Sequence, residues 1–262
     1  MSPQHAPVPP PEFFIVGCVR SGTTFLRDLF RRYPGLICPE EMHFFRNGDP
    51  FRCGATFRDL RDNPVLRKHR ELDGVPEDAF RTLLHLSADR ADLQRRYIAA
   101  YAEARGMSDY RWFDKTPQNI YGVPLIAGQF PKTKFVFLVR NPLDVVASLK
   151  LGKVIKVTDI HGACNYWLEA CTIIRSLAPA LGRRLVIVQY EDLVADVPGT
   201  MSDLAAVLGL EQQDCFRKDD ARPVIEPWRQ GLDAEEADMV RFRCADLALG
   251  FGYDLRDGSA DS

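Results

Sequence analysis

The sequence predicts an α/β fold in which helices flank a central parallel sheet. Short apolar runs at 13–16, 135–139 and 185–188 have the length of buried strands rather than of helices. Each run ends at a glycine or at polar turn residues, and a helical pattern follows it. Strands that alternate with helices favour a parallel sheet covered on both faces.

The individual elements follow in order along the chain. The first strand covers 13–17 and leads into a helix that begins near Thr23 and stops before Tyr33. The charged segment 49–106 is mostly helical in pattern, because Leu93, Tyr97 and Tyr101 recur every four residues. Beyond it we expect a short strand at 111–113, a loop at 114–117, strands at 134–139 and 185–188, and helices from Pro142, over 161–181, near 198–208 and over 234–249.

Composition bounds the domain organisation and the partners. We expect one domain over 12–256, between a disordered leader at 1–11 and a disordered tail at 257–262. The net charge of −2 creates no basic field, so no nucleic-acid partner is expected. No apolar run approaches the roughly 20 residues of a membrane span, and the leader lacks a secretory apolar core. Seven scattered cysteines without a CxxC pair favour reduced thiols in the cytoplasm.

The segment Gly17–Thr24 has the frame of a phosphate-binding loop. Its two glycines are separated by four residues, follow a predicted strand and open a predicted helix. Such a loop turns backbone N–H groups inward, and the helix N-terminus adds partial positive charge, so both favour a phosphate. The candidate contacts are Arg20, Ser21, Gly22, Thr23 and Thr24. A glycine-containing turn without a ligand is the alternative.

The loop differs from that of nucleoside triphosphatases at one position. Thr23 stands where those enzymes carry lysine, and the cation is instead Arg20 inside the loop. The strand 134–139 ends at Arg140, where a triphosphatase carries an acidic magnesium ligand. Two arginines and several hydroxyls suit an anionic donor without a metal, so no metal ligands are expected. Sulfuryl transfer fits, because the SO₃ unit carries less negative charge than a phosphoryl group.

Arg140 and Ser148 form a candidate second anion site. They lie eight residues apart, across a strand end, a turn led by Pro142 and the first turns of a helix. Arginine supplies a planar fork of donors that matches phosphate. In isolation, a solvated arginine and a filler serine explain the pair equally well. A phosphate loop with a separate arginine–serine pair is what a 3′,5′-bisphosphorylated nucleotide needs.

Together these segments resemble the sulfotransferases that use 3′-phosphoadenosine-5′-phosphosulfate (PAPS). The loop is similar to their 5′-phosphosulfate loop, in the arginine form of tyrosylprotein sulfotransferases and their bacterial relatives. Glu40–Phe45 resembles the segment that carries the catalytic glutamate in tyrosylprotein and heparan sulfate sulfotransferases. The other similar segments are the 3′-phosphate segment Arg140–Pro142 with Ser148, the lysine motif Asp114–Pro117, and Tyr190–Leu193 and Phe251–Asp254 of the bacterial members.

The resemblance implies a single P-loop-like domain, PAPS as co-substrate and adenosine 3′,5′-bisphosphate (PAP) as product. An acceptor hydroxyl or amine would receive the sulfuryl group. It implies that Glu41 is the general base and that Lys115 neutralises charge in the transition state. With Arg20 and His43 these are the candidate catalytic residues. Tyr190 joins the loop, Arg140 and Ser148 as a candidate nucleotide contact.

Several alternatives stay open. His43 serves Glu41 or the acceptor, or is structural, whereas the other histidines show no partner pattern. The basic glycine-rich motif of the cytosolic enzymes is missing, and Arg222, Trp228 and Arg229 are candidates to replace it. A P-loop kinase or other ATP-dependent phosphotransferase is the alternative function, and a non-catalytic nucleotide-binding module is the third. The acceptor, a small molecule, a carbohydrate or a tyrosine-containing peptide, is expected under the 49–106 region, and the oligomeric state stays open.

Overall fold

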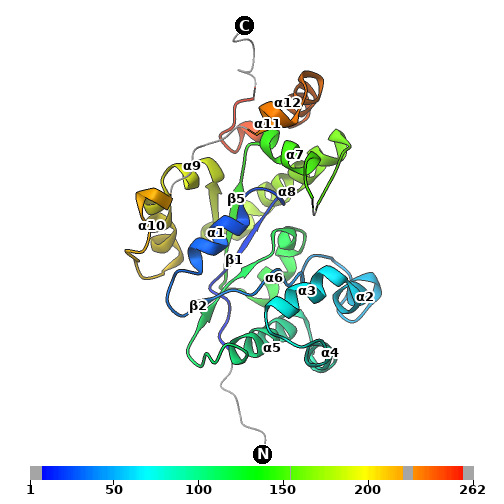
Figure 1. The fold of residues 1–262 in the computed structure, drawn as a ribbon, viewed down its shortest axis with the longest axis vertical. Helices are drawn as coiled ribbons and strands as arrows, with labels where there is room; N and C mark the ends of the chain where they lie inside the picture. The colour runs from blue at the N-terminus through cyan, green and yellow to red at the C-terminus, as the bar shows by residue number, and fades with distance from the viewer. Residues whose placement is uncertain (1–7, 154, 221–226, 256–262) are drawn as a thin grey trace, which may run out of the picture. The chain divides into compact units, whose positions relative to one another are not determined.

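The computed structural model describes residues 8–153, 155–220 and 227–255 of the protein, and it confirms the α/β fold (Figure 1). The central sheet has the strand order β4-β1-β5-β6, formed by Asp114–Lys115, Phe13–Gly17, Lys134–Val139 and Leu185–Gln189. Strand β1 pairs in parallel with β4, with Phe14 opposite Asp114. A separate parallel pair joins β2 (Leu36–Ile37) to β3 (Arg111–Trp112). The predicted central parallel sheet flanked by helices is therefore confirmed.

Every predicted helix is present, and the structure adds helices at 123–129, 190–195 and 228–231 that the sequence did not predict. In the charged segment the helices are α2 (Gly54–Asp62), α3 (Pro64–Leu72), α4 (Glu77–Leu86) and α5 (Arg90–Glu103). The others are α1 (Thr23–Phe30), α6 (Val123–Gln129), α7 (Pro142–Lys150), α8 (Ile160–Leu181), α9 (Tyr190–Ala195), α10 (Val197–Leu208), α11 (Trp228–Gly231) and α12 (Ala234–Leu249). Short 3₁₀ turns occupy Pro117–Gly122, Gly182–Arg184 and Lys218–Asp220. No helix in the described ranges is long and apolar enough to cross a membrane.

The expectation of a loop from Asp114 onward is wrong for its first two residues. Asp114 and Lys115 form strand β4, although neither residue type favours strands. Both side chains are almost fully buried, at 1% and 2% exposure. Their polar groups have partners inside the protein, and backbone pairing with β1 supplies the strand's hydrogen bonds. Tertiary context therefore overrides local propensity here.

The contacts of the chain group into two compact units. The first holds the described residues up to Val16 together with Thr24–Phe135. Its core is aromatic, with the ring of Phe13 4.6 Å from Phe30 and 4.7 Å from Phe113 between centroids. Such ring pairs add to the stability that apolar burial gives. Helices α2 to α5 lie together within this unit (Figure 1).

The chain joins the first unit before β1 begins. The carbonyl of Pro9 accepts a 2.7 Å hydrogen bond from Trp112 Nε1, and that of Pro11 accepts one of 3.2 Å from Thr133 Oγ1. Residues 1–7 of the predicted leader and 256–262 around the predicted tail lie outside the described residues. The division into leader, domain and tail stays a prediction.

The second unit holds Gly17–Thr23 and the described residues from Val136 onward. In it α7, α8, α11 and α12 pack together (Figure 1). The ring of Phe251 lies 5.9 Å from Phe137 of β5 and 6.3 Å from Trp167 of α8. Helix α12 begins with a capping box between Asp233 and Glu236, which satisfies two free N–H groups. The segment around Phe251 thus packs onto β5 and α8.

Candidate active site

The phosphate loop turns tightly after β1, in the second unit. The N–H of Ser21 donates to the carbonyl of Cys18 over 3.3 Å, and Arg20 adopts the left-handed φ of 70°. Gly17 is required by a close approach, because a Cβ there would lie 2.7 Å from the carbonyl oxygen of Leu138. A non-glycine residue in this backbone region is strained, and such strain concentrates at functional sites.

Arg20 reaches from the loop to helix α7. Its Nε donates a hydrogen bond to Ser148 Oγ over 2.9 Å. The sequence places these two residues in separate anion sites, yet the structure brings them into contact. Arg20 is exposed, so its guanidinium stays accessible to a ligand.

Arg140 has other neighbours than Ser148. One terminal nitrogen lies 3.4 Å from Asp144 Oδ2, and the guanidinium carbon lies 4.4 Å from the centre of the Tyr190 ring. Burial raises the pKa of Asp144, although the charge of Arg140 opposes the rise. The Nε of Arg140 is buried and has no hydrogen-bond partner among the described residues, and the same holds for Ser21 Oγ. An unpaired buried donor costs about 1–3 kcal/mol, so an anion bound here would relieve that cost.

Tyr190 completes this cluster at the start of α9. A Cβ on Gly22 would lie 2.4 Å from two carbons of the Tyr190 ring, and Gly22 has a φ of 90°. The ring therefore packs directly on the phosphate loop as well as beneath Arg140. Two arginines and a serine hydroxyl, with buried polar atoms that have no partner among the described residues, offer hydrogen-bond donors to anionic groups on this part of the second unit.

Glu41, Lys115 and Thr24 form a second cluster, in the first unit. The Nζ of Lys115 contacts Glu41 Oε1 at short hydrogen-bond distance and lies 3.3 Å from Thr24 Oγ1. His43 Nε2 lies 3.4 Å from the other carboxylate oxygen of Glu41, and the role of His43 stays a prediction. Burial alone would raise the pKa of Glu41, but the hydrogen bond from His43 and the charge and hydrogen bond of Lys115 lower it to about 2.

Glu40 has a structural role rather than a place in this cluster. Its carboxylate pairs with Arg27 at 2.6 Å and with Arg31 at 3.2 Å, and its N–H donates to Asp73 over 2.9 Å. Neither carboxylate is fully exposed, since the side chains of Glu40 and Glu41 are 24% and 26% accessible. The two neighbours are oriented by different sets of cations.

Asp114 is a buried support that sequence reasoning missed. Its carboxylate accepts hydrogen bonds from Gln94 Nε2 over 3.0 Å and from Asn119 Nδ2 over 3.1 Å. Burial raises the pKa of Asp114 to about 7, against the hydrogen bonds and the charge of Lys115. Its position directly before the motif lysine, after the apolar pair Trp112-Phe113, was the available signal.

His69, for which the sequence shows no partner pattern, lies beside the Glu41 cluster. Its Nδ1 lies 2.9 Å from the carbonyl oxygen of Glu41, and its ring stacks on His43 with centroids 6.2 Å apart. A carbonyl only accepts, so Nδ1 carries the proton in this bond. No sequence signal connects His69 to a residue that lies 28 positions earlier.

The candidates for the missing basic motif are only partly described. Arg222 lies outside the described residues. Trp228 begins α11, and its N–H donates to Asp144 Oδ1 over 3.3 Å. The guanidinium of Arg229 lies 4.5 Å from the Trp228 ring centre. Trp228 thus reaches Arg140 through their shared partner Asp144.

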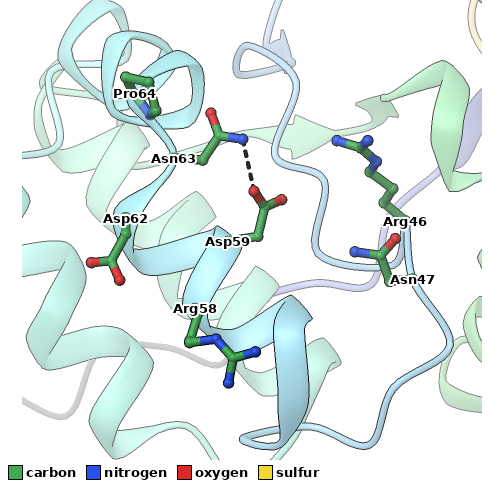
Figure 2. A pocket seen from close by; sticks show the side chains of 7 residues that line it. All are labelled: Arg46, Asn47, Arg58, Asp59, Asp62, Asn63 and Pro64. Atoms are coloured by element: carbon green, nitrogen blue, oxygen red, sulfur yellow. Dashed lines mark hydrogen bonds between the residues drawn. The ribbon is translucent and has the colours of Figure 1, made fainter.

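An open cavity of about 550 Å³ lies in the first unit (Figure 2). It is lined by Arg46, Asn47, Arg58, Asp59, Asp62, Asn63 and Pro64. Asn63 Nδ2 donates to Asp59 Oδ1 over 2.8 Å, which orients both groups. The N–H of Arg46 donates to the carbonyl of His43 over 3.3 Å, so the chain runs from the Glu41 cluster directly into the cavity wall. The lining residues from Arg58 to Pro64 belong to the charged segment 49–106, which was expected to cover the acceptor.

The central parallel sheet, with the glycine-flanked loop Gly17–Gly22 between β1 and α1, defines an α/β protein with a P-loop-like fold. Residues 11–214 match the model of the Sulfotransferase family, and the chain belongs to that family. The predicted family is therefore confirmed. Among the described residues, no group of three or more His, Cys, Asp or Glu side chains is arranged to hold a metal ion.

Two curated relatives share 25% identity with the chain. Nodulation protein NoeE of Sinorhizobium fredii matches over 92% of the chain, and Protein-tyrosine sulfotransferase 2 of Gallus gallus over 78%. The match spans 65% and 52% of the length of these relatives.

Solved structures show the same fold at low identity. The sulfotransferase domain of the Synechococcus PCC 7002 olefin synthase superposes with a TM-score of 0.61 at 21% identity, covering 97% of this chain and 98% of that one. The sulfotransferase domain of the curacin biosynthetic pathway gives 0.60 at 17%, covering 94% and 99%. A mouse sulfotransferase complexed with PAP gives 0.52 at 14%, covering 94% and 88%.

Proposed function

We propose that this sulfotransferase moves a sulfuryl group from PAPS to an acceptor hydroxyl or amine and releases PAP. The observation that carries the proposal is the position of Lys115 in the first unit. Its ammonium group touches both the carboxylate of Glu41 and the hydroxyl of Thr24, and Thr24 is the last residue of the phosphate-loop motif. One lysine thus connects the expected base to the end of the loop. Membership of the sulfotransferase family supports the same reaction.

The donor would be held by the residues of the second unit. The loop N–H groups, with Arg20, Ser21, Gly22 and Thr23, would bind the 5′-phosphosulfate at the start of α1. Arg140 and Ser148 would bind the 3′-phosphate, because the unpaired Nε of Arg140 offers a buried donor. Tyr190, whose ring lies beside Gly22 and Arg140, would contact the adenosine or its phosphate.

The proposed reaction is an in-line displacement at sulfur. Glu41 takes the proton of the acceptor as the acceptor oxygen or nitrogen forms its bond to sulfur. The bond between sulfur and the bridging phosphate oxygen breaks, and PAP carries away the electron pair. Lys115 and Arg20 neutralise the charge that builds on the bridging and sulfuryl oxygens. His43 holds the carboxylate of Glu41 in position through its 3.4 Å contact.

The pairing of Glu41 with Lys115 controls how basic Glu41 is. With a pKa near 2, Glu41 is ionised at neutral pH but is a weak proton acceptor. When Lys115 turns its charge toward the oxygens of the donor, Glu41 loses a stabilising partner and its pKa rises. Donor binding would therefore activate the base.

The acceptor is proposed to enter through the cavity of Figure 2, next to the segment that carries Glu41. The lining by arginine, asparagine and aspartate offers hydrogen bonds and charge rather than apolar contact. A hydroxyl-rich or charged acceptor fits such a lining better than an apolar one. A tyrosine-containing peptide stays among the candidates, because one relative is a protein-tyrosine sulfotransferase.

The proposal is tested by transfer of label from ³⁵S-PAPS to a panel of sugars, phenols, tyrosine peptides and lipids, with and without a chelator. A second measurement addresses the alternative of an ATP-dependent phosphotransferase. PAP should raise the melting temperature more than ATP with magnesium does, since a ligand that binds only the folded state stabilises it. Equal or greater stabilisation by ATP would contradict the sulfotransferase proposal.

The cytoplasmic location expected for this bacterial-type enzyme is proposed on the thiols alone. All seven cysteines are unpaired in the structure, and five of them are buried. Fractionation of the native host, followed by thiol counting, tests this part.

A further inference from the structure

We propose that Glu191 is a positioning residue that fixes the backbone on which Arg140 stands. The proposal rests on the proposed function, in which Arg140 binds the 3′-phosphate of the donor. Glu191 follows strand β6, and its carboxylate oxygen Oε1 accepts a 3.1 Å hydrogen bond from the backbone N–H of Asn141. Asn141 directly follows Arg140, so this bond holds the peptide unit that links the two residues.

Tyr253 holds the other oxygen of the same carboxylate. Its hydroxyl lies 2.6 Å from Glu191 Oε2 and 3.3 Å from the carbonyl oxygen of Val139. The hydroxyl has one proton, which goes to the nearer and charged acceptor. Burial, with the charge and hydrogen bond of Glu191, raises the pKa of Tyr253, so the hydroxyl stays a donor throughout the physiological range. Glu191 is thereby held in one orientation by the C-terminal segment.

A second long-range side chain, that of Trp167, also holds the backbone at Arg140. The indole Nε1 of Trp167 donates a 2.9 Å hydrogen bond to the carbonyl of Arg140. The side chain of Asn141 accepts from the N–H of Leu143 over 3.0 Å and caps α7. Trp167 and Glu191 thus hold the two polar atoms of a single peptide group, the one that links Arg140 to Asn141. The Nε of the arginine itself is buried and has no hydrogen-bond partner within the described part of the chain, so it is a donor left for a ligand.

The C-terminal segment is itself docked on the end of β6. Gln189 Nε2 donates to the carbonyl of Phe251 over 3.1 Å. A Cβ on Gly252 would lie 2.6 Å from that Nε2, and Gly252 has a φ of 88°, so this close passage requires glycine. The segments Tyr190–Leu193 and Phe251–Asp254 therefore act together. They position the backbone that carries Arg140 for binding of the 3′-phosphate.

The test compares two ligands that differ only in the 3′-phosphate. The ratio of the affinities for PAP and for adenosine 5′-monophosphate, measured by calorimetry on the full chain, reports the contribution of that phosphate alone. Glu191→Ala should lower this ratio by roughly tenfold, comparable to losing one charged hydrogen bond, while the affinity for the monophosphate stays within about twofold. Glu191→Gln should restore most of the ratio, because its amide oxygen still accepts from Asn141.

Asp192→Ala is the control, since Asp192 is the next residue and also carries a carboxylate, and its side chain is exposed. Its ratio should equal that of the wild type. Tyr253→Phe removes a single hydroxyl, so it can replace Glu191→Ala in the test if that variant does not fold. In Tyr253→Phe the ratio of the two affinities should fall by roughly threefold. An unchanged ratio in both Glu191→Ala and Tyr253→Phe overturns the inference. If Arg140→Ala also leaves the ratio unchanged, the proposed role of Arg140 fails instead.

Discussion

Arg20 Nε and Ser148 Oγ are joined by a 2.9 Å hydrogen bond that connects the phosphate loop to helix α7. Both residues are proposed to bind phosphate groups of the same nucleotide, Arg20 at the 5′ position of the ribose and Ser148 at its 3′ position. Guanidinium groups carry five N–H donors, so Arg20 can keep this bond and still offer donors to an anion. The bond therefore orders the loop before a ligand arrives, which lowers the entropy that binding must overcome.

Arg140→Ala should weaken the binding of PAP by about 1.5–3 kcal/mol, the range for hydrogen bonds to charged groups. Adenosine 5′-phosphosulfate lacks the 3′-phosphate, and its binding should change far less. Ser148→Ala should weaken PAP by about 0.5–1.5 kcal/mol, because one neutral hydroxyl is lost. Calorimetric titration of the three proteins with both ligands checks these values. Equal losses for the two ligands would show that Arg140 does not contact the 3′-phosphate.

Glu41→Gln should lower turnover by roughly 10²–10⁴, the usual range for loss of a general base, while PAP binding survives. Glu40→Gln is the matched neighbour. It weakens the pairs with Arg27 and Arg31, so its melting temperature should fall while its turnover stays near that of the wild type. Single-turnover kinetics with saturating donor separate the two. An inactive Glu40→Gln beside an active Glu41→Gln would reverse the assignment.

Lys115→Ala should lower turnover by about 10²–10³ and should weaken donor binding more than Glu41→Gln does. It also changes the acid stability. Glu41 has a lowered pKa in the folded protein, so it stabilises the fold above its ordinary value of 4.5 and loses that contribution as the pH falls toward 2. Without Lys115 the pKa of Glu41 rises, and this part of the acid loss shrinks. Urea unfolding between pH 2.5 and 5 measures it, and an unchanged acid slope would contradict the pairing.

For Asp114 we expect the free energy of unfolding to change with pH in the opposite direction, at higher pH. Its pKa is raised to about 7, so the folded protein keeps a proton between about pH 4 and 7 that the unfolded chain has released. The free energy of unfolding should therefore fall as pH rises through that window, by at most about 1.4 kcal/mol per pH unit from this group. Asp114→Asn stays neutral and should remove the contribution. Asp109→Asn, at an exposed site, is the control and should keep the wild-type slope.

The fold was largely predictable because apolar runs and helical spacing are local signals. The strands at 13–17 and 134–139 and the helix starting at Pro142 have the predicted bounds. Strand β4 was not predictable, because its two polar residues carry no apolar pattern and owe their state to pairing with β1. The phosphate loop was visible for a related reason, since its glycines and helix start are adjacent in sequence.

The contacts within the candidate site were harder to predict from the sequence. Arg20 meets Ser148 across 128 positions, and His69 meets Glu41 across 28. Such contacts depend on how distant elements pack, and residue type alone does not reveal them. Lys115 is likewise buried because it lies in β4, and the polar residues next to it in the sequence do not predict this burial. The roles assigned to Glu41, Lys115 and Arg140 stay predictions until the variants are measured.

The ring of Tyr190 occupies the space where any side chain on Gly22 would stand, since even a Cβ would come within 2.4 Å of it. Gly22 also has a φ of 90°, a backbone conformation in which a side chain is strained whatever the space around it. A smaller residue in place of the tyrosine would remove the clash but not this strain, and it would no longer support the arginine above it. A mutational library over both positions should consequently keep glycine at position 22 in nearly every active variant.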